Sequence, residues 1–222
     1  MRLTAEDHKL VGDAVAAAEA HTDGEIVTVV ADRSDAYHDV ALHWAVLAML
    51  LVPAALATFP QWAERLWAVL DPWSLRTPVS GLFLVALVLT ALAFLLVRLA
   101  LSPMGARMAL TPRSTRARRV RRRALELFRA SAERRTKART GVLIYLSLAE
   151  RRAELIADDA IHGRVAPELW GDAMAALIER TRAGRPGEGI ATAVETVGRV
   201  LHEHFPRTDG DTNELPDRLV EL

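Results

Sequence analysis

Four side chains that could bind a metal ion lie in the second half of the chain, in turns that follow two predicted strands. They are Glu150, Asp158, Asp159 and His162. Carboxylate oxygens in loops are the ligands that Ca²⁺ and Mg²⁺ prefer. If Glu25, at the start of an earlier strand, joined them, His162 could move a proton, and Glu25, Glu150 and His162 would form a hydrolytic site. The alternative is that these residues are solvated loop residues and a helix cap, since their spacing fits no metal-binding motif.

Two other segments look like functional motifs but lack a feature that each motif requires. His202 and His204 are two residues apart on a predicted helix, so their side chains point in different directions. The segment GRPGEG lacks the Lys-Ser/Thr end of a phosphate-binding loop. The chain has no cysteine, which excludes disulfides, thiolate metal sites and cysteine nucleophiles.

The strands that would position these residues come from both sides of a long apolar region. Glu25–Ala31 reads EIVTVVA, a β-branched strand that cannot satisfy its backbone alone. Gly141–Leu148 is nearly continuously apolar, which is typical of a strand covered on both faces. Ala153–Ala157 follows closely enough to pair with it as a hairpin. The sequence therefore predicts one α/β unit whose sheet joins the two flanks of the apolar region.

Helices are predicted around these strands by apolar spacing and by end signals. Thr4 would cap the first, and Ser114 or Thr115 would cap the second. The predicted helices cover residues 3–20, 114–139, 167–183 and 187–204.

The apolar region contains two segments that are long enough to cross a membrane. Val40–Phe59 and Val79–Val97 carry no charged residue, and a span needs about 20 apolar residues. The connection between them holds Trp62, Trp67 and Trp73. Tryptophan favours the level of the lipid headgroups. We expect a membrane hairpin whose connection is a turn with anchoring aromatics, rather than a short interfacial helix.

A run of basic residues after the second span predicts the topology. The run includes Arg118, Arg119, Arg121, Arg122 and Arg123. Basic segments next to a span remain in the cytoplasm, so both termini are predicted to be cytoplasmic. Because the run follows the membrane exit and the chain has only two tyrosines, anionic lipid headgroups are favoured over nucleic acid as its partner.

These observations divide the chain into four parts. Residues 1–39 and 102–205 are predicted to be the two parts of one cytoplasmic domain, and residues 40–101 form the membrane hairpin between them. The polar, acidic segment 206–222 is predicted to be a flexible tail.

Three segments resemble the TPM-domain family, in particular its bacterial membrane branch. They read GEIVTVVADRSDAY, ARTGVLIYLSLAERRAELIADDAIHGRVAPELW and GEGIATAVETVGRVLHEHFP. The resemblance implies an α/β/α sandwich with a small central sheet, interrupted here by the transmembrane hairpin, in a bacterial inner membrane. Members of the family are described as phosphatases, as proteins that bind divalent cations, or as accessory factors of membrane complexes.

The sequence thus favours a membrane-anchored, non-enzymatic accessory or scaffold factor that binds a membrane-protein partner through its cytoplasmic domain. The alternative is a divalent-metal-dependent phosphatase centred on Glu25, Glu150, Asp158 and His162, with Ca²⁺ or Mg²⁺ as the only cofactors considered. A transporter is disfavoured because the spans carry no charge that would form a pathway. Assembly into a homo-oligomer is left open.

Overall fold

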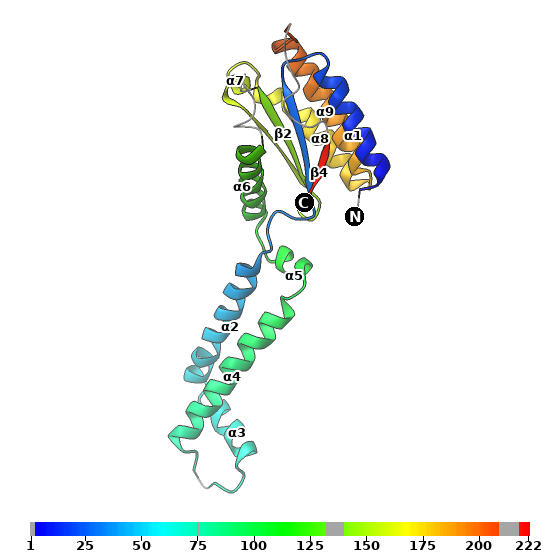
Figure 1. The fold of residues 1–222 in the computed structure, drawn as a ribbon. Coiled ribbons are helices and arrows are strands. Elements are labelled where there is room, and N and C mark those ends of the chain that lie inside the picture. Colours follow the sequence, from blue (N-terminus) through cyan, green and yellow to red (C-terminus); the bar gives the residue numbers. More distant parts are fainter. Residues whose placement is uncertain (1–2, 75, 132–139, 209–217) are drawn as a thin grey trace. The chain divides into compact units, whose positions relative to one another are not determined.

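The structure is a computed structural model that describes residues 3–74, 76–131, 140–208 and 218–222. The chain divides into two compact units. An α/β unit comprises Met1–Asp35 and Arg113–Leu222, and a helical unit comprises Ala36–Pro112 (Figure 1).

The sheet of the α/β unit has four strands in the order β3-β2-β1-β4. Strand β1 (Glu25–Ala31) pairs in parallel with β2 (Gly141–Ser147), and β2 pairs antiparallel with β3 (Arg152–Ala157). The predicted joining of both flanks in one sheet is therefore confirmed.

Alternating side chains of the strands fill two apolar layers, one on each face of the sheet. On one face, Ile26 and Val30 of β1 pack with α1 (Ala5–Glu19), α8 (Gly171–Arg182) and α9 (Pro186–His204). On the other face, Val27 and Val29 pack with α6 (Arg113–Ser131). Figure 1 shows these layers, and the α/β/α sandwich is confirmed.

Most helix ends follow the predicted signals. Thr4 caps α1 in a reciprocal capping box with Asp7, as predicted. Helix α6 begins at Arg113, one residue before its earlier predicted cap, and the rest of the predicted helix, 132–139, lies outside the described residues. A 3-10 turn, η1 (Pro167–Trp170), precedes α8, and the short helix α7 (Asp159–His162) was not predicted.

The prediction of a flexible tail over 206–222 is wrong at its end. Residues Leu219–Glu221 form strand β4, which pairs in parallel with β1 at the edge of the sheet. Leu219 is buried in the apolar layer between the sheet and α1. A short apolar sequence thus gains enough burial and backbone pairing to be ordered, although the residues before it are polar.

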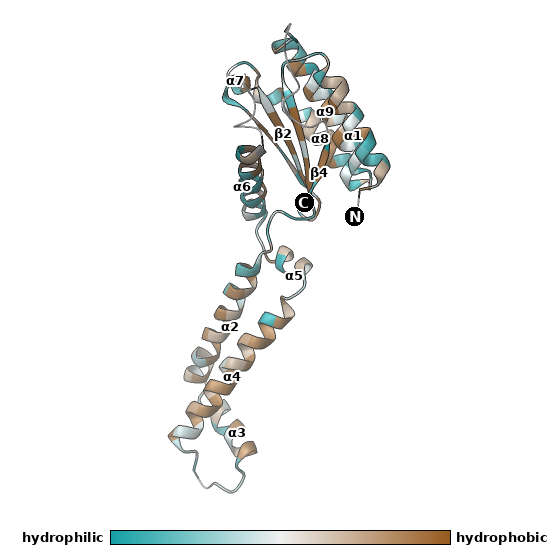
Figure 2. Cartoon of the chain, in the orientation of Figure 1, coloured by the Kyte–Doolittle hydropathy of each residue, from teal (hydrophilic) through white to brown (hydrophobic). Residues whose placement is uncertain are grey.

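The helical unit holds two helices that are long and apolar enough to cross a membrane: α2 (His38–Thr58) and α4 (Val79–Ala100). They pack against each other. Only 17% and 6% of the residues in their most apolar windows are buried, so the apolar surface of both faces outward, as the brown colour in Figure 2 shows. The unit ends with the short helix α5 (Met104–Ala109).

The prediction of a turn between these helices is wrong, because residues Gln61–Leu70 form helix α3. Trp67 lies over Gly81 of α4, where a Cβ atom would come within 2.8 Å of the indole ring. Trp62 stacks on Phe59 at 4.8 Å between ring centroids, while Trp73 remains 92% exposed. The glycine gives the apolar face of α3 a surface to pack on, which stabilises a helix there.

Candidate functional site

The predicted cluster of Glu150, Asp158, Asp159 and His162 is split by the sheet. Strands β2 and β3 are antiparallel, so Glu150, in the turn between them, and Asp158, just after β3, lie at opposite ends of the hairpin. Six residues of strand separate them, which is about 20 Å at about 3.3 Å per residue. The prediction grouped these residues by the strands that they follow, although the predicted hairpin already implied that the second strand runs back to the other end of the sheet.

Glu150 is buried and acts as an acceptor inside the fold. Its carboxylate accepts the backbone N–H of Ser34 at 3.1 Å and the hydroxyl of Ser147. The Ser34 hydroxyl lies 2.9 Å from the Tyr145 hydroxyl. Burial raises the pKa of Tyr145, and the nearby charge of Glu150 adds to that rise. Glu150 thus ties the segment after β1 to the end of β2.

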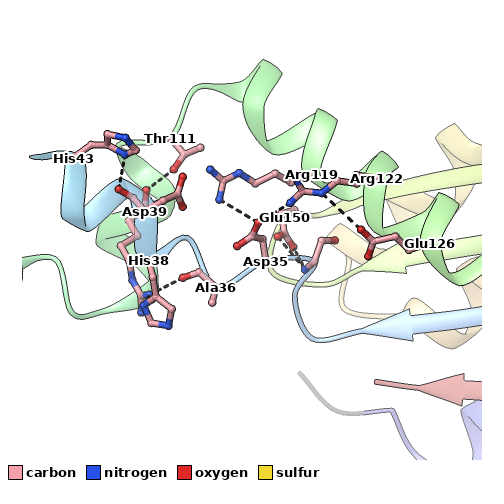
Figure 3. Close-up of polar contacts among 12 residues, drawn as sticks. Asp35, Ala36, His38, Asp39, His43, Thr111, Arg119, Arg122, Glu126 and Glu150 are labelled. Carbon is pink, nitrogen blue, oxygen red and sulfur yellow. Dashed lines mark hydrogen bonds and ion pairs between the residues drawn. The ribbon is translucent and has the colours of Figure 1, made fainter.

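Ser34 and Asp35 were not predicted as site residues, and Figure 3 shows Asp35 beside Glu150. Asp35 Oδ2 lies 3.1 Å from Arg119 and 3.3 Å from Arg122 on α6. The signal was available, since both Asp35 and Glu150 follow the carboxyl ends of parallel strands, where such sheets gather functional side chains. We call Ser34, Asp35, Arg119, Ser147 and Glu150 the carboxylate cluster.

The opposite end of the hairpin holds the other predicted residues. Asp158 Oδ2 accepts the backbone N–H of Gly141 at 2.9 Å, and Glu25 pairs with Gly141 in the parallel ladder. Asp159 and His162 are exposed on α7. In the part of the chain that the structure describes, no group of three or more His, Asp or Glu residues could hold a metal ion. The geometry does not support the predicted metal site.

A cavity of about 620 Å³ runs along strand β3, and Asp159 and His162 both line it. Apolar side chains such as Leu125, Phe128 and Met174 form much of the lining. Arg121 and Arg129 of α6 line one side, and Trp170 lines the other. We call this cavity, with the strand beside it, the β3 groove.

The backbone of β3 has a free edge along this groove. Among the described residues, β3 pairs only with β2. The backbone bond from Asp158 N–H to Gly141 sets the alternation of the antiparallel ladder. The N–H and C=O groups that point away from β2 therefore belong to Ala153, Leu155 and Ala157, all three of which line the groove.

Two side chains in the groove have unfavourable surroundings. The indole N–H of Trp170, a residue that is 6% exposed, has no acceptor among the described residues. Burial raises the pKa of Glu154, against the opposing charge of Arg121 at 3.6 Å. A donor without a partner inside a cavity would be satisfied by a carbonyl or carboxylate of a bound molecule.

The other predicted residues are divided between the two units. The arginines predicted to set the topology lie on α6, where Arg121 pairs with Glu154, Arg122 with Asp35, and Arg123 with Glu126. Arg118 donates to Thr115. The tryptophans predicted to anchor the spans, Trp62, Trp67 and Trp73, lie in the helical unit.

Comparison with known proteins gives the family and the fold. A family model described as the TPM domain matches residues 104–200. No curated protein matches the chain. The NMR structure of the BA42 protein from the psychrophilic bacterium Bizionia argentinensis is similar, with 18% identity and a TM-score of 0.58. That alignment covers 100% of this chain and 97% of BA42, and at this identity it shows the fold alone. The match to a TPM domain over residues 104–200 covers helix α6, strands β2 and β3 and helix α8 of the sandwich.

Proposed function

We propose that this protein is a membrane-anchored, non-enzymatic accessory factor whose TPM domain binds an extended segment of a membrane-protein partner. The observation that carries the proposal is the free edge of β3 beside a mostly apolar groove. An extended peptide binds such an edge by adding a strand, with backbone hydrogen bonds for affinity and side-chain pockets for specificity.

The disposition of the carboxylates supports binding rather than catalysis. Glu150 and Asp158 accept hydrogen bonds from the backbone of the fold itself, at opposite ends of one hairpin. A metal-dependent phosphatase needs such groups to converge on one ion. The geometry therefore favours the binding function over the phosphatase, and the phosphatase is supported mainly by the family resemblance.

The charge of α6 defines the chemistry of the partner. This helix carries eight arginines and one glutamate, and Arg129, which lines the groove, has no acidic partner among the described residues. An acidic extended segment with alternating apolar residues would suit both the arginines and the apolar lining. A second copy that added its own β3 would bring a second arginine-rich helix alongside the first, which like-charge repulsion opposes.

Membrane anchoring is the other half of the proposal. Helices α2 and α4 have the length, composition and outward apolar surface of spans. The arginines after α4 favour cytoplasmic termini at a bacterial inner membrane. Carbonate extraction of native membranes tests this half by itself, because an integral protein stays in the pellet.

A proline on the outward edge of β3 tests the binding half. The N–H of Leu155 points away from β2, so Leu155→Pro removes a docking donor without removing a bond of the β2–β3 ladder. Leu155→Ala is the matched control, which shortens the side chain and keeps the donor. We expect partner proteins cross-linked in native membranes to be lost with Leu155→Pro and retained with Leu155→Ala.

Two results would contradict this function. One is equal capture of the same partner by both Leu155 variants, provided that each variant melts as one cooperative unit. The other is phosphoester turnover by purified protein that Asp158→Ala abolishes, which would favour the phosphatase.

A further inference from the structure

We infer that the helical unit contains a binding site for the phosphate group of an anionic lipid, formed by His38, Arg98 and Arg107. These residues line a cavity of about 540 Å³ together with Leu95, Leu99 and Ser102. The cavity lies entirely within the helical unit, where α2 begins and α4 ends. We call it the arginine pocket. The lipid source of the phosphate rests on the proposed membrane anchoring, whereas the recognition of phosphate does not.

Arg107 is a buried cation whose hydrogen bonds, in the part of the chain that the structure describes, go to neutral groups. Arg107 is 8% exposed. Its Nη1 donates to the carbonyl of Ala36 at 2.6 Å and to His38 Nδ1 at 2.9 Å, and Nη2 donates to the carbonyl of Ser102 at 2.8 Å. Its buried Nε–H has no acceptor among the described residues. A buried charge is costly without an opposite charge, so the guanidinium favours an anion from outside the chain.

The contact with Arg107 also fixes the state of His38. A guanidinium can only donate, so Nδ1 of His38 must accept, and the ring proton sits on Nε2. Figure 3 shows the His38 ring beside Ala36, where Arg107 binds both. The imidazole is thereby held with a second donor available to a ligand. Asp39, the acid nearest in sequence, does not line the pocket.

Arg98 adds a second cation, in the last turn of α4. It is exposed and has no carboxylate partner in the described part of the helical unit. Two guanidiniums without acids in one cavity suit phosphate, because the planar fork of arginine binds two phosphate oxygens at once.

The apolar residues of the pocket favour a lipid over free phosphate. Leu95 and Leu99 precede and follow Arg98 by one turn or less and are 60% and 70% exposed. They offer surface to an acyl chain at the level where the arginines would hold the headgroup. Basic pockets between membrane helices bind lipid headgroups in this way.

The experiment uses the full chain in a zwitterionic detergent, with bound lipid counted by native mass spectrometry. The probes are phosphatidylglycerol, phosphatidylcholine and inorganic phosphate. We expect phosphatidylglycerol to bind in preference to the other two. Arg98→Gln should weaken that binding roughly tenfold or more, as expected for the loss of one charged hydrogen-bonding partner. Arg98 is the residue to change because it is exposed, whereas Arg107→Gln removes three bonds of the fold.

Arg65→Gln is the matched control, since Arg65 is an exposed arginine of α3 that does not line the pocket. Equal binding of phosphatidylglycerol by the Arg98 and Arg65 variants overturns the site. If inorganic phosphate binds as tightly as phosphatidylglycerol and is lost with Arg98→Gln, the phosphate site stands and its lipid source is overturned. Extraction of the chain by carbonate would reject the anchoring while leaving the phosphate measurement in place.

Discussion

Each unit of this protein contains an arginine with little exposure, and the two arginines differ in the charge of their partners. In the α/β unit, the side chain of Arg119 is 15% exposed and lies 3.1 Å from the carboxylate of Asp35. In the helical unit, Arg107 is 8% exposed, and its hydrogen bonds among the described residues go to two carbonyls and an imidazole. Arg119 of the carboxylate cluster has an acidic partner, and Arg107 of the arginine pocket has none among the described residues.

This difference separates a structural network from a binding site. Charges that have an opposite charge within the fold hold segments together, as Asp35 holds the segment after β1 to Arg119 of α6. Cations that have only neutral partners retain attraction for an external anion. Arginine is thus structural in the α/β unit and available for binding in the helical unit. Changing the partners of Arg119 should therefore affect stability, whereas changing the arginine pocket should affect ligand binding.

Glu150→Ala should give the largest loss of stability. It leaves the part-buried N–H of Ser34 and the buried hydroxyl of Ser147 without their acceptor, so we expect the free energy of unfolding to fall by about 3 kcal/mol. Denaturant melts of the full chain in detergent, followed by circular dichroism, measure this. Glu150→Gln keeps an acceptor oxygen and should lose less. A loss equal to that of an exposed substitution would show that the cluster is not structural.

Asp35→Asn should have the next largest effect. It removes the negative charge of Asp35 from the mostly buried Arg119, and we expect the free energy of unfolding to fall by about 1–2 kcal/mol. Glu188→Gln is the control, because it breaks the exposed pair with Arg185 and should change stability by no more than about 0.5 kcal/mol. If the two variants have the same stability, then the pair of Asp35 with Arg119 does not stabilise the α/β unit, and the contrast with the arginine pocket is lost.

The sequence predicted the sandwich better than it predicted the site. Strand Glu25–Ala31 needed a partner, and Gly141–Leu148 was the most apolar segment available, so their pairing followed from elementary backbone requirements. Glu150 and Asp158 were grouped wrongly because the predicted hairpin, whose strands run antiparallel, puts its turn and the end of its second strand at opposite ends. Arg107 could not have been found, since its burial depends on packing against the carbonyl of Ala36, which lies far away in sequence.

The smallest effect concerns Glu154, where burial opposes an ion pair within the α/β unit. Burial raises the pKa of Glu154 above the ordinary value of 4.5, although Arg121 and Arg152 lower it. Between the unfolded and folded pKa values the folded state binds more protons, so this group's contribution to stability is full below the unfolded pKa and falls as pH rises through the folded one. Glu154→Gln removes that dependence. We expect the melting temperature of the variant to rise relative to that of the wild-type chain as pH rises from 4.5 towards neutral. A gain in the opposite direction would mean that the pair with Arg121 outweighs burial, and that the α/β unit balances even this partly exposed charge.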